Sequence, residues 1–227
     1  MLLQVKSVSK AYGKPGMAAY QEVLSNLSLG VDEGDSVAIT GPSGSGKTTL
    51  LNLIGTLDKP DRGTILYRDK DITGLSDKKL NTFRNSEIGF IFQQHHLLPQ
   101  CTLIENVLLP TLPGRTDKEA VSRAERLIER VGLSEHMHKK PRLLSGGECQ
   151  RTAVVRALIN NPGMVLADEP TGALDHDNAM ALYDLLSEVN REEKVTLIVV
   201  THSLELAARL NRVYRLMNGK LELINLQ

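Results

Sequence analysis

The chain has 227 residues, with 27 Lys and Arg balanced by 27 Asp and Glu, 41% hydrophobic residues and no Trp. A chain of this length can bury a core that folds without disulfides or structural metal ions. Its two cysteines are too few for a disulfide framework and suggest a reducing compartment. Zero formal net charge, with no cluster of Lys or Arg, gives no electrostatic basis for wrapping nucleic acid, so nucleic acid is not an expected partner.

The sequence also lacks the signals of membrane insertion. No stretch approaches the roughly 18 continuous apolar residues that a spanning helix needs. The first ten residues, MLLQVKSVSK, do not form the apolar run of a signal peptide. We therefore expect a cytoplasmic chain that reaches a membrane only through a partner.

Short apolar runs predict the strands of a sheet. Residues 1–30 have the pattern of edge strands. Later runs at 36–40, 88–92, 164–167 and 195–200 mostly lack polar alternation, which is typical of parallel strands buried on both faces. Helical spacing follows the first of these runs, over 50–57, and precedes the last, over 182–189. This succession of strand and helix predicts an α/β fold with a mostly parallel sheet.

A helical lobe is expected within this fold. Thr116 and Glu119 have the spacing of a capping box, and helical spacing of apolar residues continues from Ala120 through Val121 to Val131 before Gly132. Because residues 94–160 contain helix signals and no strand run, we expect a single domain with a core lobe (1–93 and 161–227) and an inserted helical lobe (about 94–160). The apolar segments on either side of Asn218-Gly219 predict a closing hairpin.

The clearest motif is a phosphate-binding loop. The run from Gly41 to Thr48, GPSGSGKT, matches G-x-x-x-x-G-K-[ST] and lies between a predicted strand and a predicted helix. Its glycines allow backbone N–H groups to face phosphates, Lys47 can reach the β- and γ-phosphates, and Thr48 can offer a hydroxyl to Mg²⁺. ATP and Mg²⁺ are therefore the expected ligands.

Polar residues follow three other buried strands. Asp168 and Glu169 end the run that begins at Met164, where one carboxylate can serve Mg²⁺ and the other can orient water. Gln93 follows the run at 88–92, and Thr201-His202 follow the run at 195–200. Since the carboxyl ends of parallel strands meet at one edge of a sheet, we expect these groups to gather around the same phosphate.

One further motif selects a family. LSGGE at 144–148, with the phosphate loop before it and ADEPTGALD and VTH after it, closely resembles the nucleotide-binding subunits of ATP-binding cassette (ABC) transporters. The resemblance spans essentially the whole chain. It implies an ATPase that closes as a head-to-tail homodimer, each ATP lying between the phosphate loop of one subunit and LSGGE of the other. It also implies integral membrane partners and a place on the cytoplasmic side of the inner membrane.

The resemblance assigns roles to individual residues. It makes Glu169 the general base, with His202, Gln93 and Lys47 also catalytic, and it places Thr48, Gln93 and Asp168 at Mg²⁺, Asp168 through water. Tyr12 would stack on adenine, although a tyrosine on an edge strand is otherwise ordinary packing. The implied nucleotide-contacting residues are Tyr12, Gly41, Pro42, Ser43, Gly44, Ser45, Gly46, Lys47, Thr48, Thr49, Gln93, Ser145, Gly146, Gly147, Glu148, Asp168 and Asp175.

A narrower resemblance points to one branch of the family. The segments FIFQQHHLLP, LIENV and ADEPTG are similar to those of lipoprotein-releasing (LolD-type) and macrolide-exporter (MacB-type) ATPases. In that branch Leu97 and Leu98 would contact the membrane partner, or they would instead fill the core of the helical lobe. Cys149, Ser203 and Ala173 depart from the usual pattern without removing a catalytic group.

Other interpretations remain open. A non-transport ABC ATPase acting on nucleic acid or ribosomes would keep the same site, but this chain has neither a long coiled coil nor a second cassette. A soluble kinase would have no role for LSGGE. His136 and His138 lie close in sequence, but two histidines in a polar turn are expected to be solvated rather than to bind metal.

Overall fold

The computed structural model describes residues 1–13, 20–113 and 119–225, and Thr116 lies outside the described residues. Two sheets contain its strands. The first has the order β2-β1-β4-β5 and the second β10-β9-β3-β8-β7-β6. The strands of the first sheet are β1 (Leu3–Tyr12), β2 (Gln21–Val31), β4 (Arg62–Tyr67) and β5 (Lys70–Asp71); those of the second are β3 (Ser36–Thr40), β6 (Ile88–Ile91), β7 (Met164–Asp168), β8 (Thr196–Val200), β9 (Arg212–Met217) and β10 (Lys220–Ile224).

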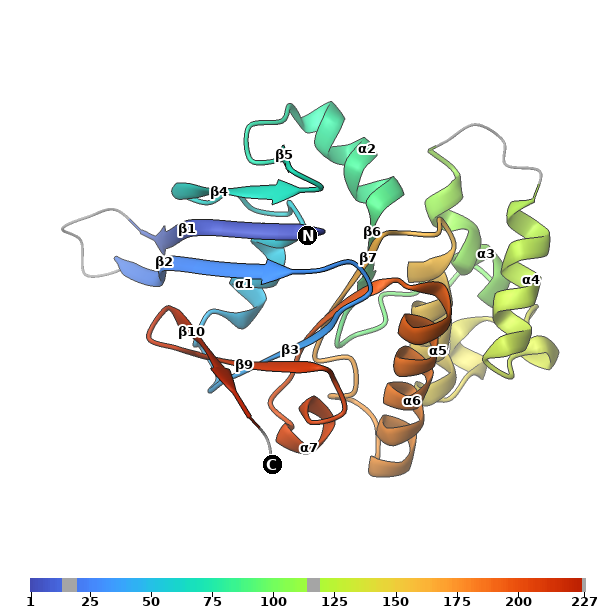
Figure 1. Ribbon diagram of the computed structural model, residues 1–227. Coiled ribbons are helices and arrows are strands. Elements are labelled where there is room, and N and C mark those ends of the chain that lie inside the picture. The colour runs from blue at the N-terminus through green and yellow to red at the C-terminus, as the bar shows by residue number, and fades with distance from the viewer. Residues whose placement is uncertain (14–19, 114–118, 226–227) are drawn as a thin grey trace.

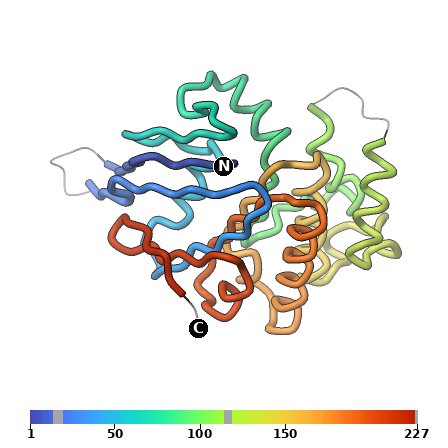
Figure 2. Tube along the Cα trace, in the orientation of Figure 1, coloured from blue at the N-terminus to red at the C-terminus, as the bar shows by residue number. Residues whose placement is uncertain are grey.

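Helices lie on both sides of the second sheet and at one end of the molecule (Figure 1). The α-helices are α1 (Lys47–Ile54), α2 (Asp77–Glu87), α3 (Leu103–Leu108), α4 (Ala120–Arg130), α5 (Gly146–Leu158), α6 (His176–Glu193) and α7 (Leu204–Ala207); the 3-10 turns are η1 (Leu109–Thr111), η2 (Ser134–His136) and η3 (Pro141–Leu143). Between residues 94 and 160 the described chain forms helices and no strand. Figure 2 shows α3 and α4 at one end of the molecule, with the C-terminal end of β1 and the start of β2 at the opposite end.

The second sheet is parallel except at β10, which pairs antiparallel with β9. Its central strands bury both faces. In β7, Leu166 packs toward the first sheet and α1, whereas Val165 packs toward α5 and α6; Ile198 and Leu197 divide in the same way in β8. The predicted parallel α/β core is therefore confirmed, and the unbroken apolar runs reflect burial on two sides.

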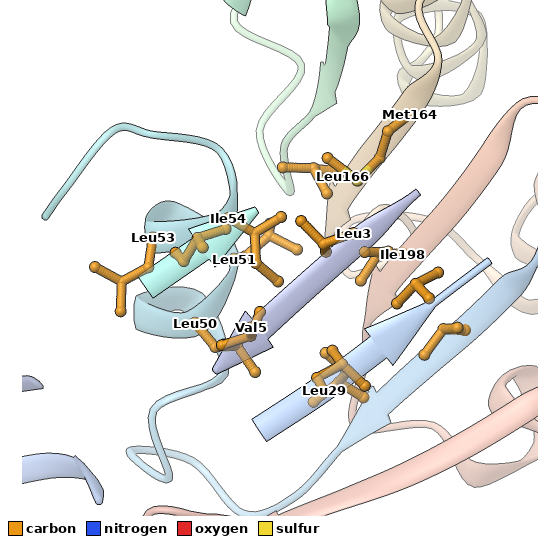
Figure 3. Close-up of a cluster of buried hydrophobic side chains, with 14 of the residues drawn as sticks. Leu3, Val5, Leu29, Leu50, Leu51, Leu53, Ile54, Met164, Leu166 and Ile198 are labelled. Carbon is orange, nitrogen blue, oxygen red and sulfur yellow. The ribbon is translucent and has the colours of Figure 1, made fainter. Parts of the chain in front are cut away.

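A core of leucine, isoleucine and valine side chains joins the two sheets. Leu3 and Val5 of β1 meet Leu50 and Leu51 of α1 there, with Ile198 from β8 (Figure 3). Full burial of each such side chain is worth about 1.5–3 kcal/mol. This packing holds α1, and with it the loop that precedes α1, rigidly between the sheets.

Some sequence expectations were wrong in detail. Strand β1 is not an edge strand, because β2 and β4 pair with it on either side. Helix α1 ends at Ile54, one residue before Gly55, whose missing Cβ makes room for the Phe90 ring, so Leu57 lies outside the helix and is exposed. In α4, Val121 is exposed, while Ala124 faces the core.

Candidate functional site

The loop from Gly41 to Thr48 joins β3 to α1 and leaves the start of α1 open. Gly46, at φ 101°, is the N-cap of α1, no side chain among the described residues caps the helix, and its first turn contains no acidic residue. Gly41, at φ 152°, lies so close to the backbone of β9 that a Cβ would be 2.4 Å from the carbonyl oxygen of Leu216. Unpaired N–H groups at a helix N-terminus attract anions, so this loop can bind phosphate.

Two polar groups are enclosed within the loop. The ammonium of Lys47 donates to the carbonyl oxygens of Gly41 (2.9 Å) and Pro42 (3.0 Å), although the residue is buried. The buried hydroxyl of Ser45 makes no hydrogen bond with any of the residues that the structure describes. A held cation beside an unsatisfied hydroxyl is a suitable environment for an anionic ligand.

Strand β7 brings a carboxylate to this loop. The hydroxyl of Thr48 donates to Oδ1 of Asp168 at 3.3 Å. Burial raises the pKa of the Asp168 carboxyl above its usual value; the Thr48 hydrogen bond and the Lys47 charge oppose this rise, and the Glu169 charge adds to it. A hydroxyl and a carboxylate in contact are oxygen ligands of the kind that Mg²⁺ prefers.

Glu169 and His202 form the second polar pair. Oε2 of Glu169 lies 2.9 Å from Nδ1 of His202 and also accepts from the His202 backbone N–H at 3.3 Å. Glu169 has φ 46°, which is uncommon for a residue other than glycine and turns its side chain away from the line of β7. The two carboxylates at the end of β7 thus take different partners, one facing Thr48 and the other facing His202.

Gln93 follows β6, which pairs with β7 on the side opposite β8. Gln93 and His202 therefore follow the two strands that flank β7. A Cβ on Gly172 would be 2.8 Å from Nε2 of Gln93, so Gln93 packs closely against the loop that follows Glu169. The ends of β3, β8, β7 and β6, adjacent strands in that order, therefore bring these predicted site residues to one edge of the sheet.

The residues of LSGGE begin helix α5. Ser145 is the N-cap, its Oγ accepts from the backbone N–H of Glu148, and Oε2 of Glu148 accepts from the backbone N–H of Ser145 at 2.6 Å. A Cβ on Gly147 would be 2.9 Å from Oδ1 of Asn178 in α6. Asp175 caps α6 and holds the Asn178 side chain at 2.7 Å, so the start of α5 and the Asp175 loop are in contact.

Tyr12 is half exposed near the end of β1 and is fixed by two neighbours. Its hydroxyl donates to Oδ2 of Asp58 at 3.0 Å, and the ammonium of Lys10 lies 5.2 Å from its ring centre. Lys10 also donates to Oδ1 of Asp58 at 2.8 Å. The ring is thus held on its inner side, with an exposed surface on which an aromatic ligand can stack.

Several supporting residues were missed by the sequence analysis. Gln150 donates to the backbone carbonyl of Phe92, and Arg156 donates to the carbonyls of His95 and His96, so α5 holds the segment after Gln93. Neither has a motif signal, because each acts on a backbone far away in sequence. Leu97 is buried and Leu98 is exposed, so Leu98 rather than Leu97 presents surface that a partner could contact.

The expectation that His136 is solvated was wrong, since its Nε2 lies 3.3 Å from Oε1 of Glu148. His138 is exposed, as expected. Within the described ranges, no group of three or more His, Cys, Asp or Glu side chains is placed to hold a metal ion. Among the same residues, no helix is both long and apolar enough to span a bilayer.

The chain is similar to a known protein family over most of its length. The model of the ABC transporter family matches residues 24–172, which include the phosphate loop, Gln93, LSGGE and the Asp168-Glu169 pair. The chain belongs to the ABC transporter family. Its described fold is accordingly that of an ATP-binding cassette, and the resemblance noted in the sequence is confirmed.

Relatives extend the similarity across the chain, beyond the matched range to Tyr12 and His202. The lipoprotein-releasing system ATP-binding protein LolD of Saccharophagus degradans is 48% identical over 88% of this chain and 88% of its own length. LolD of Pseudomonas syringae pv. tomato is 45% identical over 97% and 96%. A dimeric ATP-binding cassette in a post-hydrolysis state, bound to ADP and phosphate, superposes with a TM-score of 0.89 at 38% identity, covering 100% of this chain and 99% of that one.

Proposed function

We propose that this ABC cassette hydrolyses ATP as one half of a paired cassette and drives a membrane complex that releases lipoproteins. The observation that carries the catalytic part is the placement of the Glu169–His202 pair beside the Thr48–Asp168 pair, at the edge of the sheet where the phosphate loop begins α1. The identity to LolD proteins, 45% or more over nearly the whole chain for several of them, supports the lipoprotein-releasing branch.

The phosphate loop fits the anionic part of ATP. The uncapped start of α1 offers N–H groups and Lys47 offers a buried ammonium, while Ser45 offers a buried hydroxyl that lacks a partner within the described part of the chain. Each would gain a hydrogen bond or a charge partner from a triphosphate. Pro42, Ser43, Gly44 and Thr49 complete the expected contacts within this loop and the first turn of α1, and Tyr12 would stack on the adenine ring.

Thr48, Asp168 and Gln93 fit the oxygen donors that Mg²⁺ requires, with Asp168 acting through water. Bound there, the ion would neutralise charge on the β- and γ-phosphates. Glu169 accepts a proton from the water that attacks the γ-phosphorus, as the bond from that phosphorus to the ADP oxygen breaks. His202 holds the Glu169 carboxylate in position for this proton transfer. The reaction converts ATP and water to ADP and phosphate.

LSGGE would act on the ATP held by a second cassette. Ser145, Gly146 and Gly147 form the start of α5, where N–H groups and a hydroxyl can face an anion. Glu148 caps that turn, and Asp175 lies in the loop that contacts it through Asn178. Closure of two cassettes around ATP would therefore bring this helix end to the γ-phosphate, and hydrolysis would release it.

A groove beside Gln93 would receive the membrane partner. It has a volume of about 820 Å³ and a mostly apolar lining, and it lies between α2, β6, α5 and the segment after Gln93. Leu57, Phe90 and Pro110 contribute apolar surface to it, and Arg84 and Arg156 contribute charge. A short helix of a membrane subunit would fit such a groove, which would place the cassette on the cytoplasmic side of the inner membrane.

The test uses Glu169→Gln, which should bind ATP, lose turnover and form an ATP-dependent dimer. Affinity purification of this variant with ATP from detergent-solubilised membranes, followed by mass spectrometry, should recover a membrane protein with few spans and a large extracytoplasmic domain. Recovery of soluble proteins alone would favour the non-transport alternative. Turnover at the wild-type rate would show that Glu169 is not the base.

A matched pair of surface variants tests the groove. Leu57→Glu places a charge among the lining residues and should lose the membrane protein in the same purification. Leu223→Glu changes another exposed leucine, on β10 and away from the groove, and should retain the membrane protein. Equal recovery with both variants would contradict docking at this groove.

A further inference from the structure

The carboxylate of Glu148 is held from two sides. Its Oε2 accepts from the backbone N–H of Ser145, within the capping box of α5. Its Oε1 lies 3.3 Å from Nε2 of His136, a residue of η2 that precedes α5 by ten positions. About a quarter or less of either side chain is exposed, at 26% for His136 and 20% for Glu148, so water screens this contact only in part.

The other ring nitrogen of His136 fixes the tautomer. The ammonium of Lys139 lies 2.9 Å from Nδ1 of His136. Since an ammonium group can only donate, Nδ1 must accept in this contact, and the ring carries its proton on Nε2. That proton is therefore on the nitrogen nearest Glu148. Lys139, His136, Glu148 and Ser145 form one continuous chain of polar contacts.

The turn that contains His136 is anchored in the helical lobe. The backbone N–H of Lys139 donates to the carbonyl of His136, and the carbonyls of Lys139 and Met137 accept from Leu103 and Ile104 at the start of α3. These hydrogen bonds fix the backbone of the turn that carries the imidazole of His136. The hydrogen bond from the backbone N–H of Ser145, the largest contribution, lowers the pKa of the Glu148 carboxyl, and the charge of Arg151 acts in the same direction.

We infer that His136 is a positioning residue for the signature serine Ser145, acting through Glu148. His136 restricts the rotation of the Glu148 carboxylate, and Glu148 in turn fixes the backbone of Ser145. In this arrangement Oγ of Ser145 accepts from the backbone N–H of Glu148, so the hydroxyl is held at the start of α5. This inference rests on the proposed function, in which Ser145 contacts the ATP of a partner cassette.

His136→Leu should weaken ATP-driven pairing without weakening ATP binding. In the Glu169→Gln background, we expect the ATP concentration for half-maximal dimer formation to rise about three- to tenfold, the range that corresponds to loss of a helix cap. Size-exclusion chromatography with light scattering measures this value. Affinity for a fluorescent ATP analogue, measured at concentrations where the chain is monomeric, should stay unchanged because the phosphate loop of the same chain supplies that binding.

Conservative and neighbouring variants separate positioning from general stability. His136→Gln keeps an N–H for Glu148 and a carbonyl for Lys139, and it should restore pairing to the parent value. His138→Leu removes the exposed histidine of the same turn and should match the parent. Lys139→Met leaves the imidazole in place but removes the group that fixes its tautomer, and it should shift pairing in the same direction as His136→Leu.

The outcomes distinguish this inference from the proposed function. If the Glu169→Gln parent stays monomeric with ATP, the proposed pairing of two cassettes is wrong. The inference about His136 is then wrong as well. A parent that dimerises, with His136→Leu and Lys139→Met dimerising at the same ATP concentration, overturns this inference alone. A His136→Gln variant as impaired as His136→Leu would also overturn it, because the two retained polar contacts would then have no effect.

Discussion

Nδ1 of His202 and Oε2 of Glu169 lie 2.9 Å apart, although His202 follows β8 and Glu169 follows β7. A carboxylate only accepts hydrogen bonds, so Nδ1 carries a proton in this contact and Nε2 remains for another partner. Adjacent parallel strands therefore place a histidine where it can orient the proposed base. The backbone N–H of His202 also donates a hydrogen bond to the same oxygen.

Replacing this histidine should reduce catalysis more than binding. For His202→Ala we expect ATP turnover to fall about 10²-fold, because Glu169 loses the side chain that orients it, a loss of the size found for single positioned donors. Affinity for a fluorescent ATP analogue should stay close to that of the parent. Phosphate release at saturating ATP measures turnover. His138→Ala, at an exposed site, is the control, and equal turnover of the two variants would refute the role of His202.

Gly89 in β6 makes a close contact with α5 that tolerates no side chain. A Cβ there would lie 2.3 Å from the carbonyl oxygen of Ala157. We expect Gly89→Ala to lower the free energy of unfolding by about 1–3 kcal/mol, as overpacked sites do. Thermal unfolding should show a melting temperature several degrees lower.

Gly74 provides the matched control for this substitution. It is exposed, and a Cβ there would meet no atom of the described residues within 4 Å. Gly74→Ala should therefore change the free energy of unfolding by less than about 0.5 kcal/mol. Similar melting temperatures for the two variants would mean that β6 and α5 separate easily, contrary to the packing described above.

Arg130 ties helix α4 to the end of α6. Its guanidinium lies 2.8 Å from Glu192 and 3.2 Å from Glu188, and it also contacts Glu193. Arg130→Ala should cost about 1 kcal/mol of unfolding free energy at low salt and less at 0.5 M salt, because the network is partly exposed and salt screens it. Arg126→Ala, an exposed arginine of the same helix, should have little effect at either salt concentration. A salt-independent loss for Arg130→Ala would indicate packing by its aliphatic part instead.

Much of the fold follows from local patterns. The four apolar runs became β3, β6, β7 and β8 within two residues at each end, because burial on both faces leaves an unbroken apolar signal. The turn at Asn218-Gly219, where both residues have positive φ, closes the predicted hairpin. By contrast, the position of β1 inside its sheet depends on pairing with β4, some sixty residues later, which no local pattern records.

Some residues of the site could likewise be predicted from local sequence, and others could not. The phosphate loop and the Asp168-Glu169 pair are contiguous motifs, so their chemistry can be predicted from adjacent residues. Asn178, which touches Gly147, and His136, which faces Glu148, contribute through contacts between separate elements. Such residues have no spacing rule, and an interpretation of His136 from its polar surroundings alone predicted solvation.

The buried carboxyl of Asp168 is costly to keep ionised in the folded protein. Burial raises the pKa of this carboxyl in the folded protein, so the unfolded chain loses the proton at lower pH than the folded chain does. As pH rises from about 4, the usual range for an aspartate, ionisation therefore favours the unfolded state and the folded protein loses stability. Asp168→Asn removes that charge. We expect this variant to melt at a higher temperature than the parent near neutral pH, while losing ATP turnover.

The pH dependence makes this expectation specific. As the pH falls through the raised pKa of Asp168, the parent carboxyl becomes protonated and its charge no longer costs stability, so the difference in melting temperature between parent and variant should shrink. Thermal unfolding without nucleotide, from about pH 4.5 to 8, measures it. Glu222→Gln changes an exposed carboxylate on β10 and should show no such convergence. A variant that melts at or below the parent temperature at neutral pH would mean that the hydrogen bond from Thr48 and the charge of Lys47 outweigh the cost of burial.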